Sequence, residues 1–377
     1  MTSRERFMTA VRNQKPDMVP VCPDISNMIP CRRTGKPFWK VYRDEDPPLW
    51  KAYLSALDYF RFDGWVAYGG VTWKTRAEIE TTRKVVSRSG GRIVVASRHR
   101  TPAGELTEEV TYYRSDPPTV TRKLIKNIER DFPAFRYFLQ APVGYDDTVF
   151  REIRRRTGEK GITCISCGTP GFHGYFGSFD GGLEAVTYAY YDHPDIMEEL
   201  RELMHRMYLR QCEMICDVKP DCILTGGSGS LTLQSPGLWR KLSLPTLKEI
   251  CRMAKEAGVL TMVHSCGKER ELVKACAEET VLDCVNPLEG PPMGDCNLAE
   301  LKRSFGRRIS LMGNLHTTDV MLRGTPGDVE RAARKAIDDA GAHGGFILST
   351  GDQCGRDTPD ENIFQLIQVA RTYGKYG

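Results

Sequence analysis

Three side chains in this sequence could together bind a metal ion. His264 and Cys266 flank a single serine, and Cys354 occurs much later, in the segment Ser-Thr-Gly-Asp-Gln-Cys-Gly. One imidazole nitrogen and two thiolate sulfurs form a ligand set that zinc prefers. Three protein ligands leave the fourth tetrahedral position free, so a substrate could bind the ion directly and react there.

The sequence around these residues predicts that they follow β-strands. Residues 259–263 form a short apolar, β-branched run after a helical stretch and a glycine, which is typical of a buried parallel strand. His264 and Cys266 then lie at its carboxyl end, and Cys354 lies four residues after a similar run at 345–350. The carboxyl ends of parallel strands meet at one edge, so the three residues can converge. The alternative interpretation is a structural histidine with cysteines buried as small apolar residues.

The composition is that of a large globular protein. The chain has 377 residues and a net charge of +4, with acidic and basic residues mixed throughout. It therefore lacks the basic face that nucleic acid requires, and no stretch approaches the roughly 20 apolar residues that span a bilayer. Thirteen cysteines and the lack of an apolar leader after Met1 predict reduced thiols in the cytoplasm.

Alternating strand and helix patterns predict a barrel. Strands are expected at residues 19–21, 65–67, 162–166, 222–225, 260–263, 282–285, 309–312 and 346–349. Most of these strands are separated by a helical stretch, which predicts an α/β fold, a (β/α)8 TIM barrel, as a single domain over residues 1–377. A doubly wound dinucleotide-binding sheet would need a glycine-rich turn after the first strand, and that turn is absent. Residues 72–122 alternate β-type residues with turn signals, which predicts a β-hairpin-rich insertion that could act as a lid.

The residues that follow the strands should line the mouth of such a barrel. We predict that Asp24, His173 and Asn314 bind the substrate there. Glu289 lies on a loop stiffened by proline and glycine, beside the proposed metal site. It could be the catalytic acid or base or a fourth metal ligand, and the alternative is an ordinary carboxylate on a surface loop.

Several segments resemble the uroporphyrinogen decarboxylase superfamily over nearly the whole chain. They are residues 4–7, 15–20, 191–194, 244–245, 264–267 and 311–315. The resemblance implies a (β/α) barrel. Within the superfamily, the His-x-Cys pair with a distant cysteine is similar to the zinc motif of corrinoid-dependent methyltransferases, including methylcobamide:coenzyme M methyltransferases and the methyl-donor enzymes of O-demethylase systems. It implies that His264, Cys266 and Cys354 bind Zn²⁺, and that a partner corrinoid protein supplies the corrinoid (cobalamin).

One departure from the superfamily bears on the reaction. Uroporphyrinogen decarboxylases carry a Met-Arg-Gln-Ala-Gly-Arg motif near the N-terminus that grips the substrate carboxylates, and residues 24–34 lack it. A polycarboxylate without bidentate arginine partners would leave its charges poorly paired. The sequence therefore favours methyl transfer over porphyrinogen decarboxylation.

The expected reaction moves a methyl group between a small substrate and a corrinoid, with zinc as a Lewis acid on the substrate heteroatom. The aromatic-rich N-terminal third and the insertion favour a methoxylated, aromatic methyl donor. A thiol acceptor of the coenzyme M type is the first alternative. A decarboxylase and a non-catalytic barrel that binds a small ligand are the others. The sequence leaves open whether the chain forms a homodimer.

Overall fold

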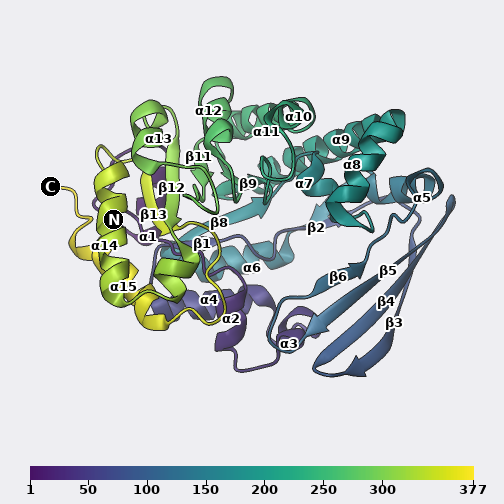
Figure 1. The fold of residues 1–377 in the computed structure, drawn as a ribbon, viewed down its shortest axis with the longest axis horizontal. Coiled ribbons are helices and arrows are strands. Elements are labelled where there is room, and N and C mark those ends of the chain that lie inside the picture. The colour runs from purple at the N-terminus through teal and green to yellow at the C-terminus, as the bar shows by residue number, and fades with distance from the viewer.

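A parallel β-sheet forms the centre of the computed structural model, which describes residues 1–377 (Figure 1). Its strands lie in the order β1, β8, β9, β10, β11, β12, β13, which is also their order along the chain. The bounds are β1 Gly64–Val66, β8 Gly161–Ser166, β9 Cys222–Gly226, β10 Leu260–His264, β11 Cys284–Asn286, β12 Ser310–Leu315 and β13 Phe346–Thr350. Every neighbouring pair in this sheet is parallel.

Residues 19–22 close the sheet into a barrel. Val21 forms a parallel bridge with Leu348 of β13. On its other side, the Val21 carbonyl accepts a 2.9 Å hydrogen bond from the Asp63 backbone N–H, directly before β1. Pro20 has no N–H to donate, which explains why this eighth strand pairs only at an isolated bridge. The (β/α)8 TIM barrel predicted from the sequence is confirmed.

Helices cover the outside of the barrel and follow the strands in turn (Figure 1). The longer ones are α1 Ser3–Val11, α4 Leu49–Phe60, α6 Thr148–Thr157, α9 Pro194–Val218, α11 Leu244–Ala257, α12 Arg270–Glu279, α13 Leu298–Phe305, α14 Pro326–Ala340 and α15 Asp360–Thr372. The other helices are α2 Met28–Arg33, α3 Phe38–Tyr42, α5 Ile128–Phe135, α7 Phe172–Tyr175, α8 Gly182–Asp192 and α10 Pro236–Leu242. None of them combines the length and the apolar character needed to cross a bilayer.

The helix before β13 shows how the sequence fixes these elements. Helix α14 begins with a capping box in which Thr325 and Asp328 satisfy each other's backbone N–H groups, and Pro326 occupies the first turn. Its buried residues recur at helical spacing, from Val329 to Ala340, so one face packs on the barrel. The position of α14 in turn fixes β13 and the loop that follows it.

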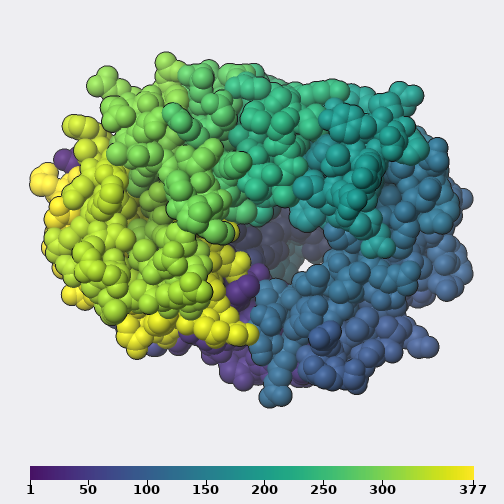
Figure 2. Space-filling model, in the orientation of Figure 1, coloured from purple at the N-terminus to yellow at the C-terminus, as the bar shows by residue number.

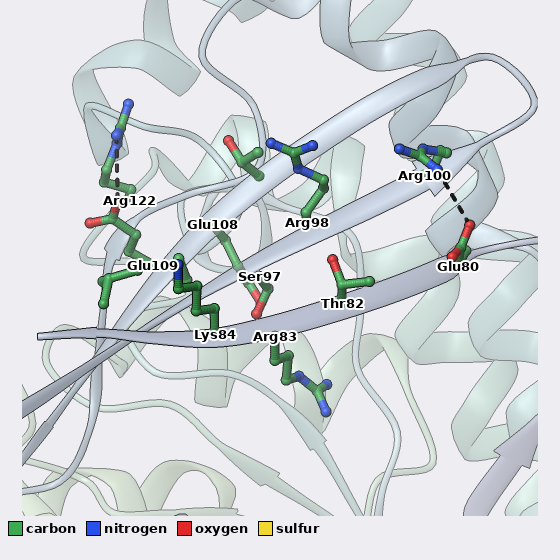
Figure 3. A pocket seen from close by; sticks show the side chains of 13 residues that line it. Glu80, Thr82, Arg83, Lys84, Ser97, Arg98, Arg100, Glu108, Glu109 and Arg122 are labelled. Atoms are coloured by element: carbon green, nitrogen blue, oxygen red, sulfur yellow. Dashed lines mark hydrogen bonds and ion pairs between the residues drawn. The ribbon is translucent and has the colours of Figure 1, made fainter.

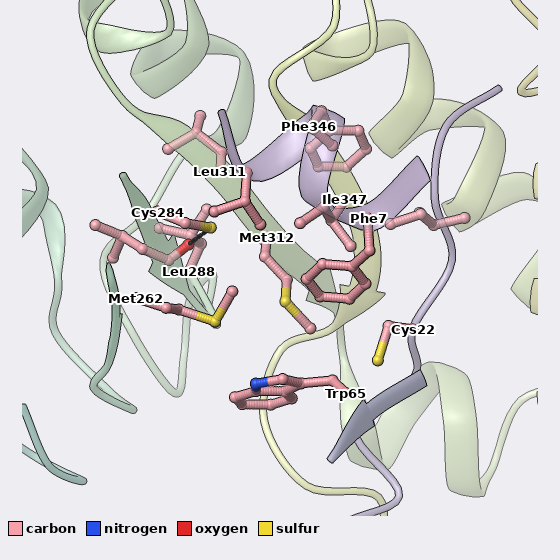
Figure 4. Packing of buried hydrophobic residues seen from close by; sticks show 14 of the residues in the cluster. Phe7, Cys22, Trp65, Met262, Cys284, Leu288, Leu311, Met312, Phe346 and Ile347 are labelled. Atoms are coloured by element: carbon pink, nitrogen blue, oxygen red, sulfur yellow. Dashed lines mark hydrogen bonds between the residues drawn. The ribbon is translucent and has the colours of Figure 1, made fainter. Parts of the chain in front are cut away.

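Buried side chains fill the space between the strands and the helices. Figure 4 shows Met262, Met312 and Trp65 pointing toward one another from three different strands, with Phe7 of α1 packed nearby. Phe7 and both methionines are fully buried. Flexible thioether side chains fill irregular gaps of this kind well. The barrel is therefore a packed core that can support a site at its mouth.

The chain between β1 and α6 leaves the barrel. Strand β2 Thr72–Lys74 pairs with β7 Gly144–Asp146, and between them lies an antiparallel sheet of β3 Glu80–Ser89, β4 Arg92–Thr101, β5 Gly104–Tyr113 and β6 Thr119–Arg122. Gly90 and Gly91 form the turn between β3 and β4 with φ of 56° and 76°, as a two-residue hairpin requires. The description of the chain as one domain with an insertion at 72–122 stays a prediction. The role of this insertion as a lid over the barrel mouth also stays a prediction.

This sheet lies apart from the barrel, and the space-filling view shows a hollow between the two (Figures 1 and 2). A cavity of about 650 Å³ lies on the sheet itself (Figure 3). Its lining includes Arg100 paired with Glu80 and Arg122 paired with Glu109. It contains no histidine or cysteine, so it does not offer the predicted metal ligands.

Candidate metal centre

His264 is the last residue of β10 and faces Asn286 of β11 across the sheet. The Nδ1 atom of His264 lies 2.7 Å from the amide oxygen of Asn286. Because that oxygen can only accept a hydrogen bond, Nδ1 carries a proton, and Nε2 is the ring atom left to coordinate an ion. This arrangement is the usual one around metal-binding histidines, where an outer hydrogen bond fixes the tautomer and the ring orientation.

One group of side chains at the mouth could hold a metal ion: His264, Cys266 and Asp352, whose ligand atoms all lie within 4.8 Å of one another. The His264 Nε2 atom is 3.7 Å from Oδ1 of Asp352. Nitrogen and oxygen ligands of a tetrahedral zinc ion lie roughly 3.4 Å apart, given bonds of about 2.0–2.1 Å. The observed separation is therefore close to what a shared ion requires.

Cys354 does not belong to this group in the structure. It is fully buried, and its backbone N–H donates a 2.8 Å hydrogen bond to the carbonyl of Asp24. Burial, together with the charges of Asp24 and Asp352, raises the pKa of the Cys354 thiol to about 12, although Thr350 lowers it. The structure thus brings His264 and Cys266 together and places Asp352 where the sequence suggested Cys354. A ligand role for Cys354 stays a prediction.

Two predicted site residues, Glu289 and Asn314, form hydrogen bonds that hold the loop beside the metal group. Glu289 is 7% exposed, and its carboxylate accepts a hydrogen bond from the backbone N–H of Gly267. Burial raises the pKa of Glu289, while the Gly267 N–H opposes this. Asn314 donates a 3.0 Å hydrogen bond to the carbonyl of Leu288, so it positions the residue next to Glu289. The proposed catalytic role of Glu289 and substrate role of Asn314 stay predictions.

Asp24 lies at the same mouth, as predicted, and accepts a hydrogen bond from the Ser26 hydroxyl. Burial raises the pKa of Asp24, whereas the charge of His264 and the Ser26 hydroxyl lower it. Its backbone N–H donates to the Thr350 hydroxyl at 3.0 Å. The Thr350 contact joins the segment after the first barrel strand to the end of β13, and the Asp24 carboxylate is close enough to His264 to influence its pKa.

Sequence reasoning missed two carboxylates at this site. Glu269 is fully buried; its Oε2 accepts a 2.6 Å hydrogen bond from the Leu288 N–H, and its Oε1 has no partner. Burial raises the pKa of Glu269 well above its ordinary value. Asp352 lies in the same segment as Cys354, but only the structure shows that its carboxylate faces His264, with Oδ1 at 3.7 Å from Nε2. For Glu269, the available signal was an acidic residue two positions after His-Ser-Cys-Gly, at the N-cap of α12.

The electrostatics of the mouth favour a cation. Burial alone would lower the pKa of His264, but contact with Cys266, the charge of Asp24, the Asn286 hydrogen bond and the charge of Asp352 raise it to about 10. Several acidic groups and a thiol therefore surround a single imidazole. Nitrogen, sulfur and oxygen donors together are a ligand set that suits a divalent transition-metal ion such as zinc. The residues present fit the predicted ion.

His173, which the sequence assigned to the substrate, lies in a packed setting. It is 9% exposed on the short helix α7, with Thr169 Oγ1 at 3.3 Å from Nε2 and Gln234 Nε2 at 3.3 Å from Nδ1. A Cβ added to Gly227 would lie 2.6 Å from the imidazole ring. These contacts are those of a buried structural histidine, and a substrate role stays a prediction.

A His173→Gln variant should lose less stability in mild acid than the wild type. Burial lowers the pKa of His173 from its ordinary value of 6.5 to about 4. Between these two pH values His173 is mostly protonated in the unfolded chain and mostly neutral in the folded chain, so acid favours unfolding. At pH 5 this costs the wild type about 2 kcal/mol relative to pH 7. Urea unfolding of both proteins at pH 7 and pH 5 measures the difference. An equal loss of unfolding free energy between pH 7 and pH 5 in the two proteins would show that His173 does not cause the acid destabilisation.

Comparison with known proteins identifies the family. Residues 176–373, more than half of the chain, match the family model described as uroporphyrinogen decarboxylase (URO-D). The chain belongs to the URO-D family. The resemblance seen in the sequence is therefore confirmed at the level of the family, and the matched region includes His264, Cys266 and Cys354.

Two curated relatives and one solved structure are similar to this URO-D family chain. A methylcobamide:CoM methyltransferase, MtbA, of Methanosarcina mazei is 28% identical over 137 residues, 36% of this chain and 37% of that protein. A methylated-thiol–coenzyme M methyltransferase of the same organism is 26% identical over 148 residues, 39% of this chain and 36% of that protein. This chain thus spans little more than a third of their length. A methyltransferase structure from M. mazei aligns over 99% of both chains with a TM-score of 0.68 and 15% identity, which shows the shared fold.

Proposed function

We propose that this URO-D family protein is a zinc-dependent methyltransferase that moves a methyl group between a small substrate and the corrinoid of a partner protein. The observation that carries the proposal is the convergence of His264 Nε2 and a Cys266 thiol at the barrel mouth, oriented by Asn286. The names of the two curated relatives, both of which are methyltransferases, support the same class.

In this proposal His264, Cys266 and Cys354 are the candidate zinc ligands, and bound zinc would supply a Lewis acid for the substrate heteroatom. Glu289 is the candidate acid. Its burial raises its pKa, which keeps a larger share of the carboxyl protonated, as proton donation to a departing oxygen requires. Asn314 holds the adjacent Leu288 carbonyl and so fixes the direction of the Glu289 loop.

We propose a methoxylated, aromatic compound as the first substrate class. Tyr68 lies beside Asp24 and Ser26; burial and then the charge of Asp24 raise its pKa. The Tyr53 ring lies 5.5 Å from the Tyr68 ring and supports it from the buried core. The partly exposed Tyr68 ring suits an aromatic ligand, since offset or edge-on ring pairs are favourable.

A methyl transfer assay separates the substrate classes. With reduced corrinoid protein and zinc, we expect a methoxyarene to convert the corrinoid to its methylcobalt form, which is followed by absorbance. With methylated corrinoid protein, a thiol is tested as the acceptor. Methylcobalt consumption by the thiol, together with no product from any methoxyarene, would replace the first substrate class with the second. The methylated-thiol relative gives the thiol class its support.

Two other activities remain alternatives with weaker support. A polycarboxylate substrate would need free arginines in the segment after Asp24, but Arg32 and Arg33 both pair with Asp360, and Arg33 stacks on Tyr59. A non-catalytic binding barrel would have no need of a metal, so metal analysis distinguishes it.

All 13 cysteines are free thiols, which supports the proposal of a cytoplasmic, reducing location.

A further inference from the structure

We propose that the exposed face of the antiparallel sheet β3–β6 is a docking surface for the corrinoid protein, and that it binds an acidic patch on that partner. The inference rests on the proposed function for the existence of such a partner. It gives the insertion a role that does not depend on its acting as a lid. The docking surface is defined by five cations: Lys84, Arg92, Arg98, Arg100 and Arg122.

The insertion carries the whole net charge of the chain. Residues 72–122 hold ten lysines and arginines and six acidic residues, which is a net charge of +4. The full chain has 53 basic and 49 acidic residues, so the rest of it holds 43 of each. The barrel is therefore neutral overall, and long-range electrostatic attraction directs an acidic protein to the insertion.

The strand register places the five cations on one face of the sheet. In β4, Ser97 and His99 are each 5% exposed, and the centroid of the His99 ring lies 5.3 Å from that of Phe138. Because successive side chains of a strand point to opposite faces, Arg98 and Arg100 point away from this packed side, to solvent. Strand pairing adds to the same exposed face Lys84 of β3, Arg92 of β4 and Arg122 of β6. Figure 3 shows four of the five cations around the cavity on the sheet.

Most carboxylates of the insertion already have a cationic partner, whereas most of its cations have none. Five of its six acidic side chains lie in ion pairs: Glu80, Glu105, Glu108, Glu109 and Asp116. Of its ten cations, only Arg98, Arg100 and Arg122 lie in ion pairs, and these three side chains stay mostly exposed. The surface can therefore bind further carboxylates. The three glutamates on the same face would repel the regular phosphates of a nucleic acid, whereas a protein patch can match both signs of charge.

The docking surface also has an apolar group and a protected edge. Val86 is 52% exposed and lines the same cavity as Lys84 and Arg98. An apolar centre within a charged rim is the usual anatomy of a protein interface. Strand β3 is an edge strand, but its pairing is irregular between Val85 and Ser87, and such a bulge disfavours the addition of another strand. The partner therefore docks on the face of the sheet and not along its edge.

This surface lies beside the barrel mouth. Nη1 of Arg356, two residues after Cys354, donates a 2.8 Å hydrogen bond to the Ser115 carbonyl and lies 3.5 Å from Oδ1 of Asp116, both in the turn between β5 and β6. The sheet and the barrel border the same hollow (Figures 1 and 2). A protein held on the sheet can therefore present its corrinoid to the mouth from the neighbouring hollow.

Methyl transfer by the full-length, zinc-loaded protein is measured with two forms of the corrinoid: free cobalamin, which needs no docking, and the corrinoid protein at a low concentration. In the variant Lys84→Glu/Arg98→Glu, the rate with the corrinoid protein relative to the rate with free cobalamin should fall about tenfold. Poly-L-glutamate, used as an acidic probe, should inhibit the wild type only when the corrinoid protein is present.

A second variant and a control separate docking from stability. Glu80→Gln should raise the same ratio of rates, because it leaves the charge of Arg100 less compensated, and an unfolded sheet cannot produce an increase. The control is Arg307→Glu/Arg308→Glu, with the same change in total charge. Both arginines are exposed and lie between α13 and β12, at the end of the barrel opposite the mouth. This control should keep the wild-type ratio.

The outcomes separate this inference from the proposed function. If Lys84→Glu/Arg98→Glu and Glu80→Gln keep the wild-type ratio, the methyltransferase stands and the sheet is not its docking surface. An equal fall in the Arg307→Glu/Arg308→Glu control would assign the effect to the net charge of the protein and would also overturn the inference. If the wild type transfers no methyl group with either form of the corrinoid, the inference and the proposed function fail together.

Discussion

A Cys266→Ser variant will bind zinc at least about a hundredfold more weakly than the wild type and will transfer no methyl group. Binding energies of roughly 10–16 kcal/mol shared among four ligands amount to about 3 kcal/mol for each, and 1.4 kcal/mol is a tenfold change in affinity. Serine cannot replace the thiolate, because its hydroxyl is far less acidic. Zinc content after dialysis against a chelator, together with the methylcobalt assay, measures both losses.

The matched control for this substitution is Cys216→Ser. Cys216 is partly exposed, as Cys266 is, but it lies on α9 within the helical layer. This control should keep the zinc affinity and the activity of the wild type. Retention of zinc and activity in Cys266→Ser would remove the thiolate from the mechanism. Equal losses in both variants would point to general instability instead of lost coordination.

A Gly161→Ala variant will be strongly destabilised, by about 3 kcal/mol. Gly161 begins β8, and a Cβ there would lie 2.3 Å from the carbonyl oxygen and 2.4 Å from the Cα of Gly64 in β1. Both atoms belong to the backbone, so relief requires two barrel strands to move apart. The free energy of unfolding, measured in urea, gives the cost.

Gly144→Ala is the control for the effect of an added methyl group. A Cβ at Gly144 would contact only the side chain of Lys74, at 3.9 Å. We expect its stability to match that of the wild type within about 0.5 kcal/mol, as for other surface substitutions. If Gly161→Ala unfolds at the same urea concentration as Gly144→Ala, the close approach of β1 and β8 does not hold in solution.

The barrel could be predicted from the sequence because its strands are short buried runs separated by amphipathic helices. The run at 260–263 shows this well, since it became β10 almost unchanged, with His264 at its end. The first strand was predicted correctly in position, but its weak pairing follows from Pro20, which cannot donate to β13. Register and closure depend on contacts between distant residues, which a local pattern does not contain.

The candidate site was predictable to the extent that it follows strand ends. His264 and Cys266 are fixed by β10, and the structure brings them together. The loop at 351–354 is different, because the directions of Asp352 and Cys354 depend on hydrogen bonds to Leu315 at the end of β12 and to Asp24 and Asn27 near the N-terminus. Sequence spacing gave the right loop but could not show which of its side chains faces the histidine. Glu269 was missed for a similar reason, since its burial results from the fold of the neighbouring 287–289 loop.

The central claim is that a metal ion at the barrel mouth is bound by His264 and Cys266. Zinc K-edge X-ray absorption of the zinc-loaded wild-type protein tests it most directly. We predict about one zinc per chain, with an imidazole nitrogen at about 2.0–2.1 Å and a sulfur at about 2.3 Å. A protein that retains no zinc, or a spectrum with only oxygen ligands and no sulfur, would contradict the account.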